Sequence, residues 1–420
     1  MTTTTDSPFL PAVPPHWVVN RFGRDIFVSE GQVDPRAEPW SSWILIAPNH
    51  IESGTGRLLG LETATEQGAD SGKYLAKAGQ VLYSKIRPGL NKVTLAPLDC
   101  LCSADMYAIE PRSGVNARYL AYYMRSQPFH SYASVTADRV KMPKINREEL
   151  AAAPWARPPL PEQLAIVDFL DEQTSRIDTL IDKQTQLITT LRERRAGSVS
   201  AVLAEATASA PEDRLSRRSR IGNGSTPRRE TMEYWTGGDY PWLNSAVVND
   251  RTVRGSDQFV TALARRECHL PTVHPGAVLV GLTGQGRTRG MAAILEIEAT
   301  VSQHIAYIQP DDTYWDTRFL FWSLDARYNE LRRLSDENGS TKGGLTCGDL
   351  ASLRIRRPSL ISQAEAVERI LEDTARVDAI IDKTAQHVAL AKERRAALIT
   401  AAVTGQIDVR TAGRATQGVA

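Results

Sequence analysis

Residues 281–290 form a loop whose side chains could bind the phosphates or bases of a nucleic acid. The segment reads Gly-Leu-Thr-Gly-Gln-Gly-Arg-Thr-Arg-Gly and follows a strand-like run. It lacks the Gly-Lys-Ser/Thr ending of a P-loop, so we do not expect nucleotide hydrolysis. Glycines let a backbone approach DNA closely, arginine pairs with guanine or phosphate, and glutamine pairs with adenine. The candidate DNA-binding side chains in this loop are Gln285, Arg287 and Arg289.

A second loop occupies the corresponding place in the first half of the chain. Its candidate DNA-binding residues are Lys85, Arg87, Asn91 and Lys92. Solvated turn charges are the alternative interpretation for both loops, but their correspondence between the halves favours DNA contact. For five more cations the two interpretations are evenly balanced. These are Arg139, Lys141, Lys144, Arg228 and Arg229.

The chain offers no recognisable catalytic or metal site. It has no Asn/Asp-Pro-Pro-Tyr/Phe box, which an adenine methyltransferase needs, and no acidic and lysine cluster typical of a nuclease. The four cysteines lack zinc or disulfide spacing and are interpreted as buried or incidental thiols. We therefore expect a protein that is not an enzyme, with no catalytic residue, metal or cofactor.

Composition narrows the class of protein. The chain has 420 residues, 42% of them hydrophobic and 24% charged, which indicates a globular protein of two or more domains. No apolar run is long enough to span a membrane, and the first residues do not resemble a signal peptide, so we expect a cytoplasmic protein. The net charge of +1 is low for a nonspecific nucleic-acid binder. The first arm, residues 161–206, carries 5 basic against 8 acidic residues, so any contact with nucleic acid would come from the globular parts.

A long repeat must position these loops. Residues 163–203 recur without a gap as residues 363–403, with 15 of the 41 paired positions identical. In both copies, apolar residues alternate at spacings of three and four, which predicts a coiled-coil seam. An ordinary core helix is the alternative, but two copies of about 40 residues favour long paired helices.

Each repeat carries Glu-Arg-Arg-Ala near its end, at residues 193–196 and 393–396. Arg195 and Arg395 fall on the seam, where a charge is costly unless the seam opens or a partner is met. Our hypothesis is that the final turns leave the helix pairing and dock another subunit. The candidate docking residues are Arg194, Arg195, Arg394 and Arg395.

The globular halves also repeat, more faintly. Residues 79–83 align with 276–280, and 103–111 with 302–310, as strands bounded by glycine and proline. Residues 118–123 align with 318–323 as a short aromatic helix, so each half is a mixed α/β domain. Residues 204–220 are small, polar and proline-containing, which predicts a linker.

In this arrangement the chain resembles the specificity subunit of type I restriction-modification systems. The motifs that carry the resemblance are Val81-Leu-Tyr-Ser-Lys-Ile-Arg-Pro-Gly-Leu-Asn-Lys92, Gly222-Asn-Gly-Ser-Thr-Pro227 with Tyr240-Pro-Trp242, and Leu160-Pro-Glu-Gln163. Two departures exist. The first half lacks a Gly-x-Thr-Pro motif near residues 20–25, and the second arm begins Leu360-Ile-Ser-Gln363 in place of Pro-Glu-Gln.

The resemblance implies two target-recognition domains alternating with two helices that pair as an antiparallel coiled coil. We expect recognition domains at 1–160 and 207–361, helical arms at 161–206 and 362–409, and a tail at 410–420. It also implies a subunit that reads a bipartite sequence in double-stranded DNA, one domain per half-site. Its expected partners are two methyltransferase subunits, docked on the arms, and a motor-nuclease subunit.

Two alternatives stay open. One is a non-enzymatic coiled-coil scaffold whose α/β domains bind proteins. The other is the specificity component of a related, non-type I modification enzyme.

Overall fold

The computed structural model describes residues 7–138, 143–284, 286–337 and 344–410. The chain forms two compact units, residues 1–185 with 385–420 (unit 1) and residues 186–384 (unit 2). Two long helices, α4 (Leu160–Thr207) and α9 (Leu360–Val403), each contribute one part to each unit. Helix α4 runs unbroken through Gly197, where an added Cβ would meet nothing.

Unit 1 contains two four-stranded sheets. One has the order β2–β9–β6–β7 and is antiparallel throughout; the other has the order β3–β5–β8–β4, with β4 parallel to β8. The strands are β2 (Ile26–Val28), β9 (Met106–Pro111), β6 (Val81–Ser84), β7 (Val93–Leu95), β3 (Gln32–Val33), β5 (Lys73–Ala76), β8 (Cys100–Cys102) and β4 (Leu45–Ile46). A separate ribbon pairs β1 (Val18–Arg21) with β10 (Pro154–Arg157). The helices are α1 (Ala117–Arg125), α2 (Gln127–Ala137) and α3 (Arg147–Ala152).

Unit 2 repeats this plan with different lengths. A five-stranded sheet has the order β12–β19–β16–β17–β14, and a three-stranded sheet the order β15–β13–β18. The strands are β12 (Ser219–Asn223), β19 (Ile305–Pro310), β16 (Val278–Gly281), β17 (Ala292–Leu295), β14 (Thr252–Val253), β15 (Phe259–Val260), β13 (Tyr240–Leu243) and β18 (Thr300–Val301). A ribbon pairs β11 (Glu212–Arg214) with β20 (Arg354–Arg356). The helices are α5 (Ala262–Glu267), α6 (Thr317–Asp325), α7 (Tyr328–Glu337) and α8 (Cys347–Ser352).

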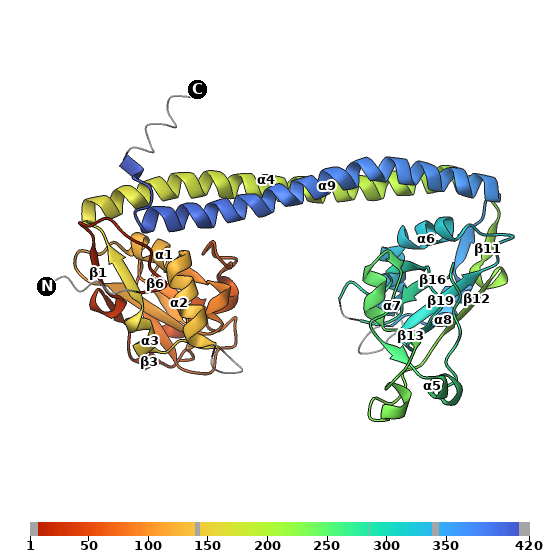
Figure 1. Cartoon of the computed structure of the whole chain (residues 1–420), viewed down its shortest axis with the longest axis horizontal. Coiled ribbons are helices and arrows are strands. Elements are labelled where there is room, and N and C mark those ends of the chain that lie inside the picture. Colours follow the sequence, from red (N-terminus) through yellow and green to blue (C-terminus); the bar gives the residue numbers. More distant parts are fainter. Residues whose placement is uncertain (1–6, 139–142, 285, 338–343, 411–420) are drawn as a thin grey trace, which may run out of the picture. The chain divides into compact units, whose positions relative to one another are not determined.

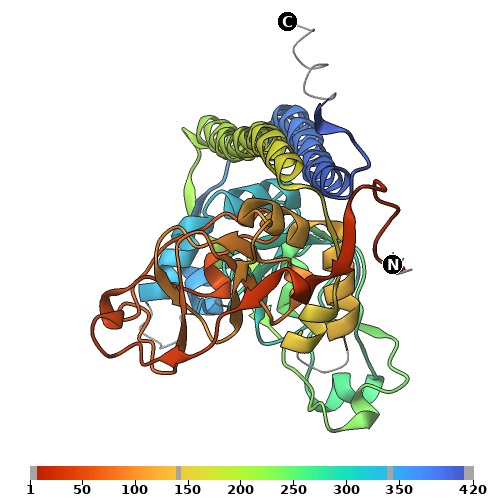
Figure 2. The same cartoon turned by 90° about the vertical axis from the view of Figure 1, so that its left-hand side faces the viewer.

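The long helices pair as an antiparallel coiled coil, which confirms the predicted fold class. In unit 1 the first turns of α4 and the last turns of α9 share one core, represented by Val167, Leu170 and Val403. In unit 2 the roles are exchanged, because Val367 and Leu203 lie in one core. Figures 1 and 2 both show α4 and α9 side by side. The residues that recur at spacings of three and four along both arms, such as Ile181 and Ile381, are at least partly buried.

A buried glutamine joins the start of α4 to the globular part of unit 1. Gln163 has no solvent exposure. Its Nε2 donates to the carbonyl oxygens of Gly114 and Pro158, both at 2.9 Å, and its Oε1 accepts from the Asn116 N–H at 2.8 Å. Asn116 in turn caps α1. An unpaired buried amide would cost free energy, so these three bonds fix how the arm leaves the domain.

Unit 2 makes the same contact with a different local sequence. The Nε2 of Gln363 donates to the carbonyl oxygens of Tyr314 and Pro358, both at 2.9 Å, and its Oε1 accepts from the Asp316 N–H at 2.8 Å. The departure at Leu360-Ile-Ser-Gln363 therefore leaves this contact intact, because the glutamine is the residue that makes it.

One prediction was wrong in part. Residues 204–220 were expected to be a linker, yet α4 continues to Thr207 and strands follow. Strand β11 pairs with β20, and β12 pairs with β19 from Ser219↔Pro310 to Asn223↔Ala306. Backbone hydrogen bonds to distant strands override the polar local composition.

Candidate functional site

The loop after β6 holds one of its candidate cations above aromatic rings. The Lys85 ammonium lies 5.1 Å from the centroid of the Tyr107 ring and 6.0 Å from that of Tyr74. Arg87 is exposed and has a left-handed backbone, with φ of 47°. Lys144 is also exposed and lies beside this loop, since its backbone bridges to Ile86. The structure therefore groups Lys85, Arg87 and Lys144 at one end of the unit 1 sheet.

The other two candidates in this loop make internal contacts. Asn91 has φ of 46°, a conformation that asparagine tolerates better than most residues, and its Nδ2 donates to the Arg125 carbonyl oxygen at 3.0 Å. The Lys92 ammonium donates to the Pro48 carbonyl oxygen at 2.5 Å. Both side chains thus hold the loop against its surroundings, and their role in DNA contact stays a prediction. Arg139, Lys141 and Gln285 lie outside the described residues.

The glycine-rich loop after β16 is held by α7. The Tyr328 hydroxyl donates to the Arg287 carbonyl oxygen at 3.0 Å, and Arg289 is buried with its Nη2 2.7 Å from a carboxylate oxygen of Asp336. The Arg287 side chain is exposed. Gly281 is required for close packing, because an added Cβ would come within 2.3 Å of the Thr288 carbonyl oxygen. Of the two arginines, Arg287 is the one whose side chain is open to a ligand.

Arg229 stacks on tryptophans. Its guanidinium carbon lies 4.1 Å from the Trp235 ring centroid and 5.1 Å from that of the buried Trp242. Its Nη2 also donates to Gln258 Oε1 at 2.7 Å. The neighbouring Arg228 is exposed. Planar stacking orients Arg229 in a way that a lysine could not reproduce.

The seam arginines are neutralised within the coiled coil. In unit 1 the Arg395 Nε lies 2.8 Å from an oxygen of Asp178, and in unit 2 the Arg195 Nε lies 2.6 Å from an oxygen of Asp378. The two pairs are the same contact, displaced by 200 residues. Arg395 is only 6% exposed.

These ion pairs correct the hypothesis that the seam opens at its ends. A carboxylate on the opposing helix neutralises each arginine, so no opening is needed. The turns that follow are also packed, since Val199 and Ile399 are buried in the cores of their units. The neighbouring arginines, Arg194 and Arg394, are exposed and remain candidates for docking.

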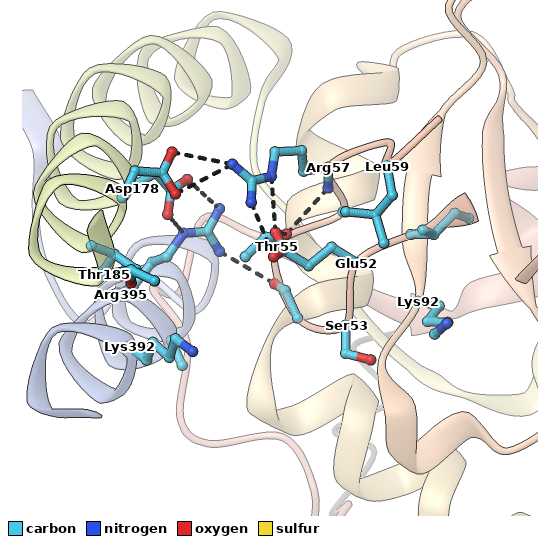
Figure 3. Close-up of a pocket in the computed structure, with 16 residues that line it drawn as sticks. Glu52, Ser53, Thr55, Arg57, Leu59, Lys92, Asp178, Thr185, Lys392 and Arg395 are labelled. Atoms are coloured by element: carbon cyan, nitrogen blue, oxygen red, sulfur yellow. Dashed lines mark hydrogen bonds and ion pairs between the residues drawn. The ribbon is translucent and has the colours of Figure 1, made fainter. Parts of the chain in front are cut away.

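Figure 3 shows how the unit 1 pair extends to the globular part. Arg395 Nη1 donates to the Gly54 carbonyl oxygen at 3.2 Å, and Arg57 contacts Glu52 at 3.2 Å and Asp182 of α4 at 3.1 Å. These contacts line an open pocket of about 760 Å³ with side chains of both signs. Charge compensation of this kind attaches residues 52–57 to the arms.

The thiols of unit 1 are buried and difficult to deprotonate. Cys100 and Cys102 are buried and free. Burial raises the pKa of the Cys100 thiol to about 12, and it raises the pKa of the Cys102 thiol further. Among the described residues, no group of three or more His, Cys, Asp or Glu residues could hold a metal ion. In the same part of the chain, no helix combines the length and apolarity needed to cross a membrane.

Comparison with known proteins shows what part of the chain is similar to. Residues 219–388 match the type I restriction modification DNA specificity domain. The specificity subunit of the type I restriction enzyme EcoDI from Escherichia coli is 41% identical over 175 residues, which are 42% of this chain and 38% of that protein. Over these residues, the chain is similar to the specificity subunits of type I restriction-modification systems.

A second specificity subunit and a solved structure are also similar to this chain. The EcoR124I/EcoR124II specificity subunit of Escherichia coli is 18% identical over 146 residues, 34% of this chain and 36% of that one. The matches thus span less than two fifths of these curated specificity subunits. A chain solved in work on complex assembly and conformational transition of the type I R-M system has a TM-score of 0.71 at 20% identity. It covers 94% of this chain and 100% of its own length, and this likeness shows the fold.

Sequence reasoning missed several polar residues beside the glycine-rich loop of unit 2. Thr226, Thr283, Gln303 and His304 are joined by side-chain hydrogen bonds. The alignment of residues 103–111 with 302–310 could have drawn attention to Gln303 and His304, since both differ from their counterparts Ala104 and Asp105.

Removing the Arg395 side chain should lower the stability of the folded protein. Arg395→Ala leaves Asp178 and the Gly54 carbonyl oxygen without their partner, so the free energy of unfolding should fall by about 1–3 kcal/mol. Arg394→Ala is the matched control, because Arg394 is exposed, and should change it by less than about 0.5 kcal/mol. Urea unfolding measures both variants. Equal effects of the two substitutions would contradict a neutralised seam arginine.

Proposed function

We propose that this chain is the DNA-recognition subunit of a modification complex and reads a bipartite target, one unit per half-site. The observation that carries this proposal is the recurrence of one scaffold with different loops. Strand β6 and strand β16 occupy the same place in their sheets, each paired with an equivalent partner strand. The loops that follow them differ in length and in side chains. A common scaffold with two different surfaces suits a protein that reads two different sequences.

Exposed cations beside these loops support DNA as the ligand. Arg87 and Lys144 are exposed in unit 1, and Arg228 and Arg287 in unit 2. Such side chains can contact phosphates and release counterions on binding, so affinity should fall steeply as salt is raised. The small net charge of +1 limits binding to arbitrary sequences. The cations would position the protein, while neighbouring polar groups would read bases.

We further propose the division of labour along the chain. Residues 1–160 and 207–361 would be the recognition domains, and residues 161–206 and 362–409 the arms that separate them. The arms would dock two methyltransferase subunits, which supply the methyl-transfer chemistry, while a motor-nuclease subunit supplies cutting. The specificity subunit itself would not be catalytic. Residues 410–420 would be a tail.

The methylome of cells with and without this chain tests the proposal directly. We expect a methylated motif of two short half-sites separated by unread base pairs, present only with the chain. Purified protein should also bind duplex DNA containing this motif more tightly than random duplex, with a strong salt dependence. The scaffold alternative predicts neither result. A continuous motif, or methylation independent of the chain, would contradict the proposal.

Subunit docking can be tested at the two exposed arginines. Arg194→Glu combined with Arg394→Glu should reduce copurification of the methyltransferase subunit at least several-fold, because the acidic side chains reverse the local charge. Lys183→Glu, an exposed charge reversal on the same helix, serves as the control. All variants should unfold at the same urea concentration. Undiminished copurification in the double variant would exclude these residues from docking.

A further inference from the structure

The two units present an equivalent backbone edge with different side chains. In unit 1 the Lys85 N–H donates to the Asp105 carbonyl oxygen at 3.0 Å. In unit 2 the Leu282 N–H donates to the His304 carbonyl oxygen at 2.9 Å. In both units this bond closes the end of the central strand pair, β6–β9 or β16–β19. Positions that follow one strand and precede the other can therefore be compared one by one.

At this edge, unit 2 carries a chain of side-chain hydrogen bonds. The Thr226 hydroxyl donates to Gln303 Oε1 at 2.5 Å, and Gln303 Nε2 donates to His304 Nε2 at 3.2 Å. An imidazole that accepts at Nε2 carries its proton on Nδ1. His304 Nδ1 therefore donates to the Thr283 hydroxyl oxygen, 2.8 Å away. The Thr283 hydroxyl hydrogen is then free to point at a ligand.

This chain of bonds does not serve the core. Gln303 and His304 are both exposed, and exposed polar contacts contribute little to stability because water replaces them. Holding the Gln303 amide still costs side-chain entropy. A fixed, solvent-facing amide is instead what direct base recognition needs, since its plane must match the edge of a base.

The Gln303 amide can form further hydrogen bonds. One Nε2 hydrogen and one Oε1 lone pair remain after its contacts with His304 and Thr226. A donor and an acceptor side by side match N6 and N7 of adenine in the major groove. Phosphates could be contacted by the exposed Arg287, on the glycine-rich loop, and by the exposed Arg228, two residues after Thr226.

The described residues at the same edge of unit 1 do not form this chain of side-chain hydrogen bonds. The counterparts of Thr283, Gln303 and His304 are Ile86, Ala104 and Asp105, which cannot form such a chain. Its nearby polar group is Lys85, held over the Tyr107 ring. An amide reader would thus be specific to one half-site.

We propose that Gln303 is a specificity-determining residue that reads an adenine in the half-site of unit 2, and that Thr226 and His304 are positioning residues that orient its amide. This inference rests on the proposed function, because it presumes that unit 2 meets DNA. Beyond that function, the inference names the residue that reads the base, the atoms that it uses and the base that it reads.

The test compares methylated motifs in cells that carry single substitutions. Gln303→Ala should relax one A·T position in one half-site, with discrimination there falling about tenfold or more. The other half-site should be unchanged and reports that the subunit is folded and assembled. His304→Ala should relax the same position more weakly, which a merely structural role would not do. Gln406→Ala, at an exposed glutamine far along the sequence, is the control.

The outcomes separate the inference from the proposed function. An unchanged motif with Gln303→Ala would overturn the inference and leave the proposed function intact. Absence of any bipartite motif with the wild-type chain would overturn both. If Gln303→Ala abolishes methylation altogether, binding of the purified full chain decides the matter. Duplexes carrying each of the four base pairs at the expected position should then be bound with equal affinity by the variant, and retained discrimination would contradict the inference.

Discussion

An arginine buried in a helix seam must meet a carboxylate, and this requirement sets the register of the two arms. Arg395 lies opposite Asp178 and Arg195 lies opposite Asp378, so a single spacing rule is satisfied in both units. Sliding the helices by one turn would leave two charges of each sign without partners, at a cost of about 1–3 kcal/mol for Arg395, the more buried of the two arginines. Apolar seam residues permit several registers, whereas charged ones select one. The charged residues in the seam therefore give a defined alignment of α4 with α9.

The start of each arm is held by a glutamine contact that repeats in both units. Gln163 accepts a hydrogen bond from the residue that caps α1, and Gln363 accepts one from the residue that caps α6. These contacts fix the start of each arm to the globular part of its own unit. In unit 1, Arg395 also binds Gly54, and the Gly54 N–H donates to the Asn91 carbonyl oxygen at 3.0 Å. Asn91 lies in the candidate DNA-binding loop. In unit 1 these hydrogen bonds connect the seam to the loop, and a supported loop can place its contacts precisely.

How much of this could be predicted from the sequence depended on the type of signal. The 200-residue repeat and its spacing of three and four residues predicted the paired helices, because periodicity reports which face is buried. The strands at β6, β9, β16 and β19 followed from the alignment of the halves. Composition failed at residues 212–214 and 219–220, where pairing with distant strands decides the structure. It failed again at Arg195 and Arg395, since their partners lie on the other arm. Gln303 and His304 were missed because a hydrogen-bond chain built from three segments leaves no local pattern.

We propose that the arms set the separation at which the two domains read DNA. It is tested most directly by inserting one heptad after Thr185 in α4 and one after Thr384 in α9, at the boundaries of the two units. Both arginine pairs and both glutamine contacts lie outside the insertions. Seven residues add about 10 Å of helix, which equals about three base pairs at about 3.4 Å each. Methylome sequencing should then show both half-sites unchanged and the unread spacer longer by about three base pairs. An unchanged spacer in cells whose variant protein is folded and active would contradict the account.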